Sequence, residues 1–159
     1  EWLRLMNLPY SDFQPGRADP APLRAAGETF APTVCYEDAY GSEQLGLVRQ
    51  SSLLVNVTND AWFGDSTAPH QHLDISRMRA LESGRAMLRA TNDGVTALIG
   101  HDGSLLGTLP QFQPGVLTGE VQPRTGLTPY VRFGNWPILA VLWLGLAVIV
   151  VLLRRSIRR

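Results

Sequence analysis

The last quarter of the chain carries the strongest hydrophobic pattern. Residues 137–153 (PILAVLWLGLAVIVVLL) contain no charge, and the Trp143 indole is their only polar group. An α-helix of this length is about 25 Å long, slightly shorter than the ~30 Å hydrocarbon core of a bilayer. A helix that is apolar on every face is either a membrane span or the core helix of a soluble protein. Trp136 at one end and Arg154 and Arg155 at the other favour the span.

The charges that flank this segment predict its orientation. Four arginines lie within the last six residues, and basic segments next to a span stay in the cytoplasm. The pattern therefore predicts a transmembrane helix at 136–153 and a cytoplasmic basic tail at 154–159. Residues 1–135 then lie on the other side, which in a bacterium is the periplasm.

Residues 1–135 show shorter apolar runs separated by polar turns, which predict a layered α/β domain with an open sheet. Residues 9–32 hold five of the eleven prolines and are interpreted as a loop. Asp102 and Gly103 form a hairpin turn signal. Strands are expected at 30–37, 53–57, 94–100, 104–109 and 116–121, and helices at 41–50 and 70–90.

Composition narrows the class of protein. Hydrophobic residues make up 45% of the 159 residues and charged residues 18%, and the formal net charge is zero. With a single cysteine, these values exclude a disordered chain, a disulfide scaffold and a generally basic nucleic-acid binder. All fourteen basic residues are arginine. The 159 residues therefore contain no lysine whose amine could take part in catalysis. Because the chain begins at Glu1 without a methionine, we expect it to be a piece of a longer protein.

Cys35 is the first candidate for chemistry. It ends an apolar run and precedes a polar turn, as a nucleophile does on a strand-to-helix elbow. The alternative is a buried structural cysteine. Glu37 and Asp38 follow at once, and they either orient a base or ligand or cap the next helix. The spacing places none of the three histidines next to Cys35.

His70, His72 and Asp74 alternate along the chain and are the only candidate metal cluster. At the start of a helix this spacing points the three side chains in different directions, so no metal site is expected. The glycines at 94–107 fit strand ends and hairpins better than a phosphate-binding loop.

Five motifs resemble those of the apolipoprotein N-acyltransferase family, a membrane branch of the nitrilase (carbon-nitrogen hydrolase) superfamily. In chain order they are VCYE at 34–37, NDAWFG at 59–64, RMRALE at 77–82, LRATNDG at 88–94 and TGLTPY at 125–130. A terminal apolar helix follows them, as it does in the family. The resemblance covers essentially the whole chain.

The resemblance implies an α-β-β-α sandwich on a bundle of membrane helices, of which this chain is the C-terminal part. The family's catalytic triad is Glu, Lys and Cys in chain order, and its cysteine falls on Cys35. The tyrosine and glutamate that the family also needs for activity fall on Tyr36 and Glu37. The Glu and Lys of the triad lie before Glu1, so the resemblance implies that the isolated chain is inactive.

The resemblance also implies the reaction, which takes place at the periplasmic side of the bacterial inner membrane. Cys35 would take an acyl chain from the sn-1 ester of a membrane phospholipid as a thioester. The acceptor would be the α-amine of the diacylglyceryl-cysteine of an apolipoprotein, with no cofactor, metal or nucleic acid involved. We assign substrate binding to Asn59, Asp60, Trp62 and Phe63. Trp62 either faces lipid or packs in the core.

Two alternatives remain open. A soluble-type amide or nitrile hydrolase would use the same cysteine and fold, but it would not end in a membrane helix and an arginine tail. An inactive membrane-anchored remnant is the non-enzymatic alternative, favoured for the isolated chain by the absence of lysine.

Overall fold

The computed structural model describes residues 20–157, and a six-stranded sheet lies at their centre. The strands follow the sheet in sequence order from β1 to β6. β2, β3 and β4 are parallel, whereas β1, β5 and β6 pair antiparallel with their neighbours. The strands are β1 (Leu23–Ala25), β2 (Glu28–Val34), β3 (Leu53–Asn59), β4 (Met87–Asn92), β5 (Ala97–Ile99) and β6 (Leu105–Thr108).

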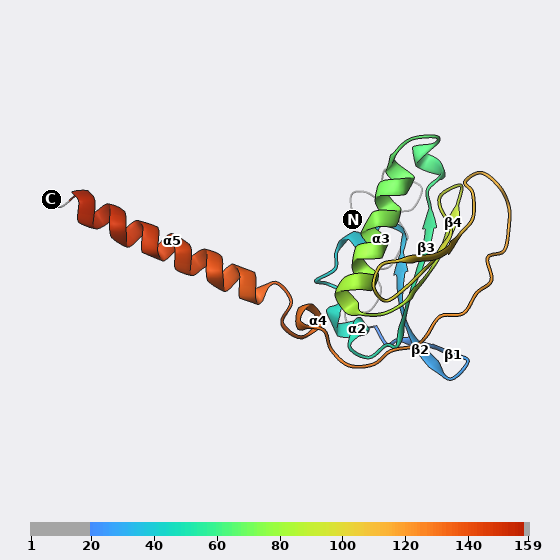
Figure 1. The fold of residues 1–159 in the computed structure, drawn as a ribbon, viewed down its shortest axis with the longest axis horizontal. Helices are drawn as coiled ribbons and strands as arrows, with labels where there is room; N and C mark the ends of the chain where they lie inside the picture. Colours follow the sequence, from blue (N-terminus) through green and yellow to red (C-terminus); the bar gives the residue numbers. More distant parts are fainter. Residues whose placement is uncertain (1–19, 158–159) are drawn as a thin grey trace, which may run out of the picture.

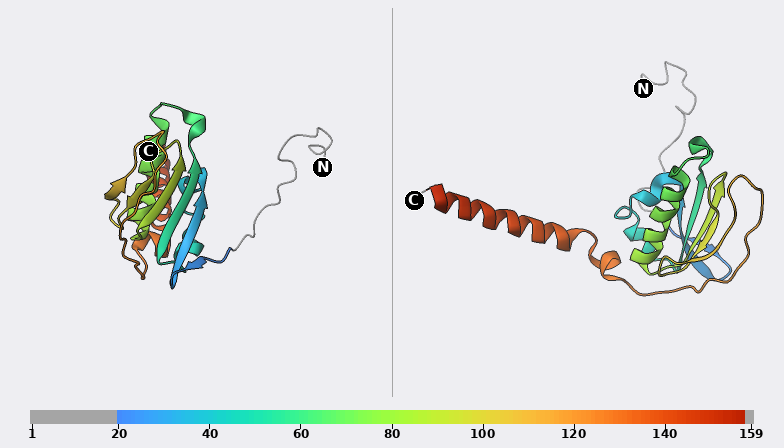
Figure 2. Two further views of the ribbon diagram at one scale, coloured as in Figure 1. Left: turned by 90° about the vertical axis from the view of Figure 1, so that its right-hand side faces the viewer. Right: turned by 45° about the horizontal axis from the view of Figure 1, so that its top comes forward.

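One long helix covers one face of this sheet (Figure 1). This helix is α3, and the irregular segment 109–128 runs past the other side of the sheet (Figure 2). The described part is thus one helical layer on one sheet, which confirms the predicted nitrilase-like α/β class. The helical elements are η1 (Cys35–Ala39), α2 (Leu45–Val48), η2 (Ala61–Phe63), α3 (Ala68–Ser83), α4 (Pro129–Phe133) and α5 (Trp136–Ile157).

The sheet face beneath α3 changes from apolar to polar along the parallel strands. Ala31, Leu54 and Met87 are buried in the apolar part. Side chains two residues apart in a strand share a face. Two residues after Leu54 and Met87 come Asn56 and Arg89, which are paired in register and also buried. The hydrophobic core therefore gives way to a buried polar layer near the carboxyl ends of the strands.

The opposite face of the sheet is less covered. Val55, Leu88 and Leu98 are half-buried there. They line a cavity of about 610 Å³ together with Val116 and Leu117 of the irregular segment. The helix-covered face therefore holds the main core, and the other face keeps accessible apolar surface.

Several expected elements are confirmed. The run at 53–57 lies in β3, the run at 94–100 contains β5, and the run at 104–109 contains β6. The Asp102-Gly103 turn joins the last two: Gly103 has a φ of 77°, and the Gly100 N–H donates to the Ser104 carbonyl at 2.8 Å. The run at 30–37 forms β2 only as far as Val34, where the chain turns into η1.

The expected helix at 70–90 is wrong beyond Ser83. Gly84 has a φ of 64° and ends α3 in the left-handed conformation, and the Arg85 N–H donates to the Ala80 carbonyl at 3.1 Å. Met87 then begins β4, which inserts between β3 and β5. Met87 and Leu88 are both apolar, which is consistent with the period of a helix and also with a strand buried on both faces. The hydrophobic pattern alone does not distinguish the helix from the strand.

Three other expectations differ from the structure. The helix at 41–50 is reduced to the four residues of α2. The segment 116–121 is not a strand, because it crosses the sheet face at Leu98 and does not pair with an edge. Within the loop expected at 9–32, residues 1–19 lie outside the described part, and the remainder contains β1 and the start of β2. Ala26 and Gly27 join these strands with φ values of 50° and 83°, as in a type I′ turn.

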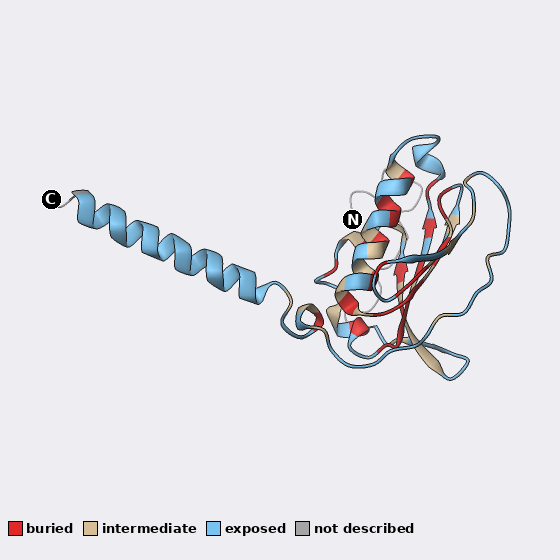
Figure 3. Ribbon diagram, viewed as in Figure 1, coloured by how far each residue is buried: buried red, intermediate tan, exposed pale blue. Residues whose placement is uncertain are grey.

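The apolar segment at the end of the chain forms α5. Among residues 20–157 it is the one helix long and apolar enough to cross a membrane: within its stretch Trp136–Ser156, an 18-residue window has a mean hydropathy of 2.7 and is not buried. Figure 3 shows it exposed along its length. The helix begins at Trp136, where the sequence places the start of the span, and continues past Arg155.

Gly84 provides a stability test with a matched control. A Cβ at Gly84 would sit at positive φ and 3.1 Å from Thr128 Cγ2, so Gly84→Ala should destabilise the fold by about 1–2 kcal/mol. Gly46 lies in α2 with no atom within 4 Å of an added Cβ. Gly46→Ala should therefore be neutral or stabilise by up to about 1 kcal/mol. Urea unfolding of both variants in mild detergent measures the difference, and equal effects would contradict this assignment of the helix end.

Candidate functional site

The parallel strands bring the candidate residues to one edge of the sheet. Open α/β sheets bind ligands outside the carboxyl ends of their parallel strands. Cys35 follows β2, Asp60 follows β3 and Asp93 follows β4. The Asp60 N–H donates to the Asn92 carbonyl at 3.1 Å, which holds two of these strand ends together. This edge is therefore the candidate site.

Cys35 lies at a sharp turn. It is the first residue of η1, its φ is 51°, and its thiol is free and part-exposed. A positive φ is costly for a residue with a side chain, and such strain concentrates at functional sites. The exposure and the turn fit a nucleophile elbow and do not fit a buried structural cysteine.

Tyr36 and Glu37 follow Cys35 on the outside of the turn, where both are exposed. The Glu37 carboxylate accepts the Val34 N–H at 2.7 Å, so in this structure it caps η1. The Tyr36 ring packs edge-to-face against Tyr40 and lies 5.8 Å from the His72 ring. The three residues of the VCYE motif after Val34 thus form one exposed turn.

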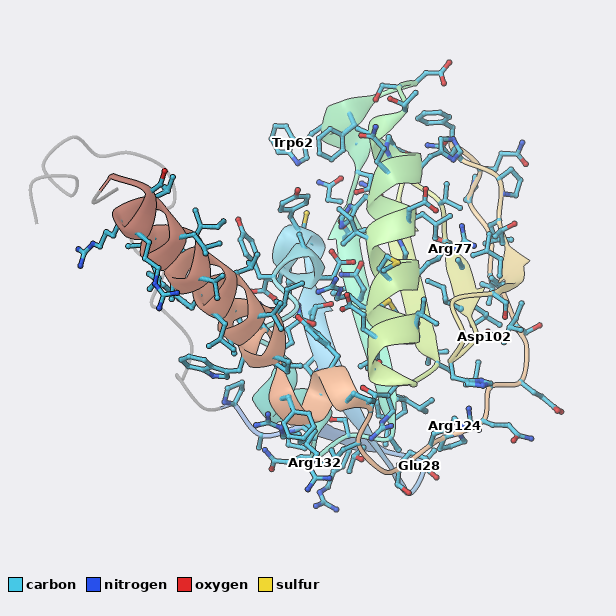
Figure 4. The ribbon with its side chains drawn as sticks, turned by 60° about the vertical axis from the view of Figure 1, so that its left-hand side comes forward. Glu28, Trp62, Arg77, Asp102, Arg124 and Arg132 are labelled. Atoms are coloured by element: carbon cyan, nitrogen blue, oxygen red, sulfur yellow. The ribbon has the colours of Figure 1, made fainter. Side chains whose placement is uncertain are left out.

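The NDAWFG motif is divided between the surface and the interior. Asn59 is exposed and its Oδ1 accepts from the Asn92 amide at 3.3 Å. Asp60 is buried, and its carboxylate is occupied by other side chains. Trp62 is 85% exposed and projects from η2 (Figure 4), and Phe63 is 43% exposed, so the interpretation of Trp62 as a core residue is wrong.

A cluster of four buried ionisable side chains lies directly beneath this edge. His72 Nδ1 is 2.9 Å from Asp60 Oδ1, and His72 Nε2 is 3.1 Å from Asp38 Oδ1. The Arg89 guanidinium lies 3.0 Å from Asp60 and 3.5 Å from Asp38. We call Asp38, Asp60, His72 and Arg89 the charge quartet. The side chains of all four are at most 3% exposed, so no bulk water screens them.

The quartet shifts the pKa values of its basic members. Burial and Arg89 lower the pKa of His72, but the hydrogen bonds with Asp38 and Asp60 outweigh them and raise it above its ordinary value of 6.5. Burial lowers the pKa of Arg89, whereas the two aspartates act in the opposite direction. Both basic groups are therefore paired with acids inside the protein.

The spacing of residues along the chain does not predict the quartet, although the sequence contains one signal for it. His72 and Ser76 lie one turn apart on α3 and share the buried side of the helix with Leu73 and Ala80. A polar side chain on an apolar helix face needs a partner inside the protein. The other members of the quartet come from three places: Asp38 follows β2, Asp60 follows β3 and Arg89 lies in β4. Their spacing along the chain does not show that they meet.

The candidate metal cluster is dispersed in the structure. His72 is directed into the quartet, while Asp74 is exposed and pairs with Arg77 at 2.9 Å. Within the described range 20–157, no group of three or more His, Cys, Asp or Glu side chains is arranged to hold a metal ion. Arg77 also donates to the Gly103 carbonyl at 2.9 Å, beside Asp102, and so ties α3 to the hairpin (Figure 4).

Comparison with known proteins agrees with this geometry. The family profile for carbon-nitrogen hydrolases matches residues 13–130. A protein of Azotobacter vinelandii named apolipoprotein N-acyltransferase is 52% identical over 99% of this chain, and a protein of the same name from Ralstonia nicotianae is 49% identical over 99%. The chain spans 30% of the length of each of these relatives.

Solved structures share the fold. An amidase from Nesterenkonia sp. is 29% identical, with a TM-score of 0.51 over 65% of this chain and 41% of that one. A carbon-nitrogen hydrolase from Helicobacter pylori G27 is 14% identical, with a TM-score of 0.54 over 62% of this chain and 42% of that one. The sheet with its helical layer, the elbow cysteine and the profile match over most of the chain lead to one conclusion: this chain belongs to the carbon-nitrogen hydrolase family.

Proposed function

We propose that this chain is the nucleophile-bearing part of an apolipoprotein N-acyltransferase, which moves an acyl chain from a membrane phospholipid to the N-terminal amine of a diacylglyceryl apolipoprotein. The observation that carries the proposal is a part-exposed cysteine at a strained turn, in a chain about half identical to proteins of that name. Cys35, Tyr36 and Glu37 form the catalytic turn, and no cofactor takes part.

In the first half-reaction the Cys35 thiolate attacks the carbonyl carbon of the phospholipid ester. The tetrahedral intermediate collapses, the bond between the carbonyl carbon and the glycerol oxygen breaks, and that oxygen takes up the proton that the thiol gave to the base. The products are a thioester on Cys35 and a lysophospholipid. The intermediate's oxyanion needs donors already in place. The backbone N–H of Tyr36 suits this role because it belongs to the first turn of η1, whose amides lack partners within the helix.

In the second half-reaction the amine of the diacylglyceryl-cysteine attacks the thioester carbon. The C–S bond breaks, an amide forms, and the amine proton returns through the base to the thiol. A thioester stores the acyl group at a reactivity that an amine can use. The chain contains no lysine, so we assign the Glu base and the oxyanion Lys of the family's triad to a segment outside these 159 residues.

The surface around the turn suits a lipid substrate. Trp62 and Phe63 are exposed beside the carboxyl edge of the sheet, and aromatic side chains favour the interface between lipid and water. With Asn59 they form the proposed substrate contacts, and the buried Asp60 supports them from below. We propose that α5 spans the bacterial inner membrane at 136–153, with residues 1–135 periplasmic and 154–159 cytoplasmic.

Amide hydrolysis is the second candidate, since the Nesterenkonia amidase shares the fold at 29% identity. Both functions require an acyl group on Cys35, and they differ in the acceptor, which is water for the hydrolase. The exposed aromatic residues of η2 and the exposed apolar α5 favour the lipid-dependent reaction.

Removal of the Cys35 thiol tests the nucleophile. A chimera in which this chain replaces the aligned segment of the Azotobacter relative supplies the remaining parts of the enzyme. With a phospholipid labelled in its acyl chain, the chimera should form a hydroxylamine-sensitive labelled protein and transfer the label to a diacylglyceryl peptide. Cys35→Ala should abolish the labelled protein and lower transfer at least about a thousandfold.

Met78→Ala is the control for this experiment, because the Met78 side chain is 47% exposed on α3 and has no proposed role in the reaction. It should leave both signals unchanged. A labelled protein that persists in Cys35→Ala would disprove the nucleophile assignment. Release of free fatty acid by the unmodified chimera, without transfer to the peptide, would favour the hydrolase.

The topology is tested separately with reporter fusions. Alkaline phosphatase, which is active only in the periplasm, should be active when fused before Trp136 of the chimera and inactive when fused after Arg159. The expectation follows from Arg154 and Arg155, which end the apolar stretch of α5 and should stay cytoplasmic. The opposite pattern of activity would contradict the proposed orientation.

A further inference from the structure

The strained turn at Cys35 is held by hydrogen bonds on two sides. A φ of 51° is unfavourable for a cysteine and persists only where the surroundings fix it. On the outside, the Val34 N–H donates to Glu37. On the inside, Asn56 Nδ2 donates to the Cys35 carbonyl oxygen at 3.0 Å.

Asn56 has a fixed orientation. It is fully buried, its Nδ2 also donates to Thr33 Oγ1 at 2.9 Å, and its Oδ1 accepts from Arg89 Nη1 at 2.6 Å. A guanidinium only donates and a backbone carbonyl only accepts, so the amide cannot be flipped without losing both contacts. Asn56 therefore links the Cys35 turn to Arg89.

Arg89 is in turn held by the charge quartet. It donates to Asp60 at 3.0 Å and to Ser76 Oγ at 2.7 Å, and Ser76 donates to Asp38. A buried guanidinium requires opposite charge nearby, because burial without it is strongly unfavourable. Asp38 and Asp60 supply two negative charges and Arg89 one positive charge, which leaves one negative charge to balance.

An imidazolium at His72 would supply the missing positive charge. Its two ring nitrogens face two different carboxylates, at 2.9 Å and 3.1 Å. Ionised carboxylates only accept, and only an imidazolium has two N–H donors. A neutral imidazole would place one nitrogen lone pair against a carboxylate oxygen. As an imidazolium, His72 completes a quartet with two positive and two negative charges.

We infer that Asn56 is a positioning residue for Cys35 and that the charge quartet, with His72 as an imidazolium, holds Asn56 in place. None of these side chains touches substrate, because all are buried beneath the turn. They act through the backbone of Cys35 by fixing the conformation that presents the thiol. The inference rests on the proposed role of Cys35 as the nucleophile.

Asn56→Asp removes the two contacts in which the amide donates, to the Cys35 carbonyl and to Thr33 Oγ1, and keeps the one in which it accepts from Arg89. Aspartate has nearly the same shape and can still accept from Arg89, but it has no donor for the Cys35 carbonyl. We expect the Cys35 φ, measured by NMR couplings and carbon shifts on the 159-residue chain in detergent, to change from positive to negative. In the chimera, thioester formation should slow about a hundredfold, as for a misplaced reacting group, with KM for phospholipid within about twofold.

Asn135→Asp is a control for the same substitution at an exposed site just before α5, where aspartate caps a helix as well as asparagine does. It should change neither the Cys35 φ nor the rate. A positive φ and an unchanged rate in Asn56→Asp would overturn the inference. If the unmodified chimera forms no thioester, the proposed function is wrong. The effect of Asn56→Asp on the Cys35 φ can still be measured on the 159-residue chain, so the two proposals fail separately.

The protonation of His72 tests the quartet without any substitution, and it decides the inference if Asn56→Asp does not fold. In a pH titration, the nitrogen chemical shifts of the His72 ring should give a pKa above 6.5, with both nitrogens protonated below it. A midpoint at or below pH 6.5 would overturn the balanced quartet.

The quartet also predicts how stability depends on pH. The charged and titratable groups that face His72 are Asp38 and Tyr36 of η1, Asp60 after β3, and Arg89 of β4. Because the pKa of His72 is raised above 6.5, its stabilisation is complete below that pH and is lost as pH rises through the pKa of the folded state. The Tm should fall by at least about 3 °C between pH 6 and pH 9, and His72→Gln should remove most of that fall. An equal fall in His72→Gln would contradict the role of His72.

Discussion

The requirement that buried charge be balanced governs the functional half of this domain. Arg89 lies on a central strand with its guanidinium facing α3, in a position that strands normally fill with an apolar side chain. Such a charge is tolerated only where acids and hydrogen-bond acceptors surround it. Asp38 comes from the turn after β2, Asp60 from the turn after β3, and His72 from α3. The buried charge of Arg89 thus fixes the turns after β2 and β3, and α3, relative to β4.

This arrangement explains why the sheet face beneath α3 is apolar in one part and polar near the carboxyl ends of the strands. The apolar layer of Ala31, Leu54 and Met87 holds α3 by non-directional packing, which tolerates small displacements. The polar layer above it uses hydrogen bonds that depend on distance and angle. We therefore infer that the first layer contributes mainly to stability, whereas the second determines where the Cys35 turn lies. A catalytic turn needs the second kind of contact, because misplacement of a reacting group by about 1 Å has a large effect on rate.

The sequence predicts the framework better than it predicts this polar layer. The apolar run that becomes β3, the Asp102-Gly103 turn and the elbow position of Cys35 depend on residues close together in the chain, so local patterns reveal them. The boundary at Gly84 was missed because Met87 and Leu88 extend the helical pattern of α3 into a strand. The quartet was missed because its members are 12 to 51 positions apart and only the fold brings them together. For Asp60, the motif predicts a role in substrate binding, whereas the structure buries its side chain.

If α5 spans a membrane, as proposed, its placement limits how the domain can meet that membrane. Thr128 donates to the Glu82 carbonyl, so α4 and the start of α5 lie near the end of α3 that is farther from the site. Trp62 lies just before the other end of α3. Sixteen helical residues separate these ends by about 24 Å. If α3 stood upright on the bilayer with α5 entering beneath it, the exposed aromatic residues of η2 would be far from the lipid. Both can reach one membrane surface only if the axis of α3 lies close to the plane of that surface.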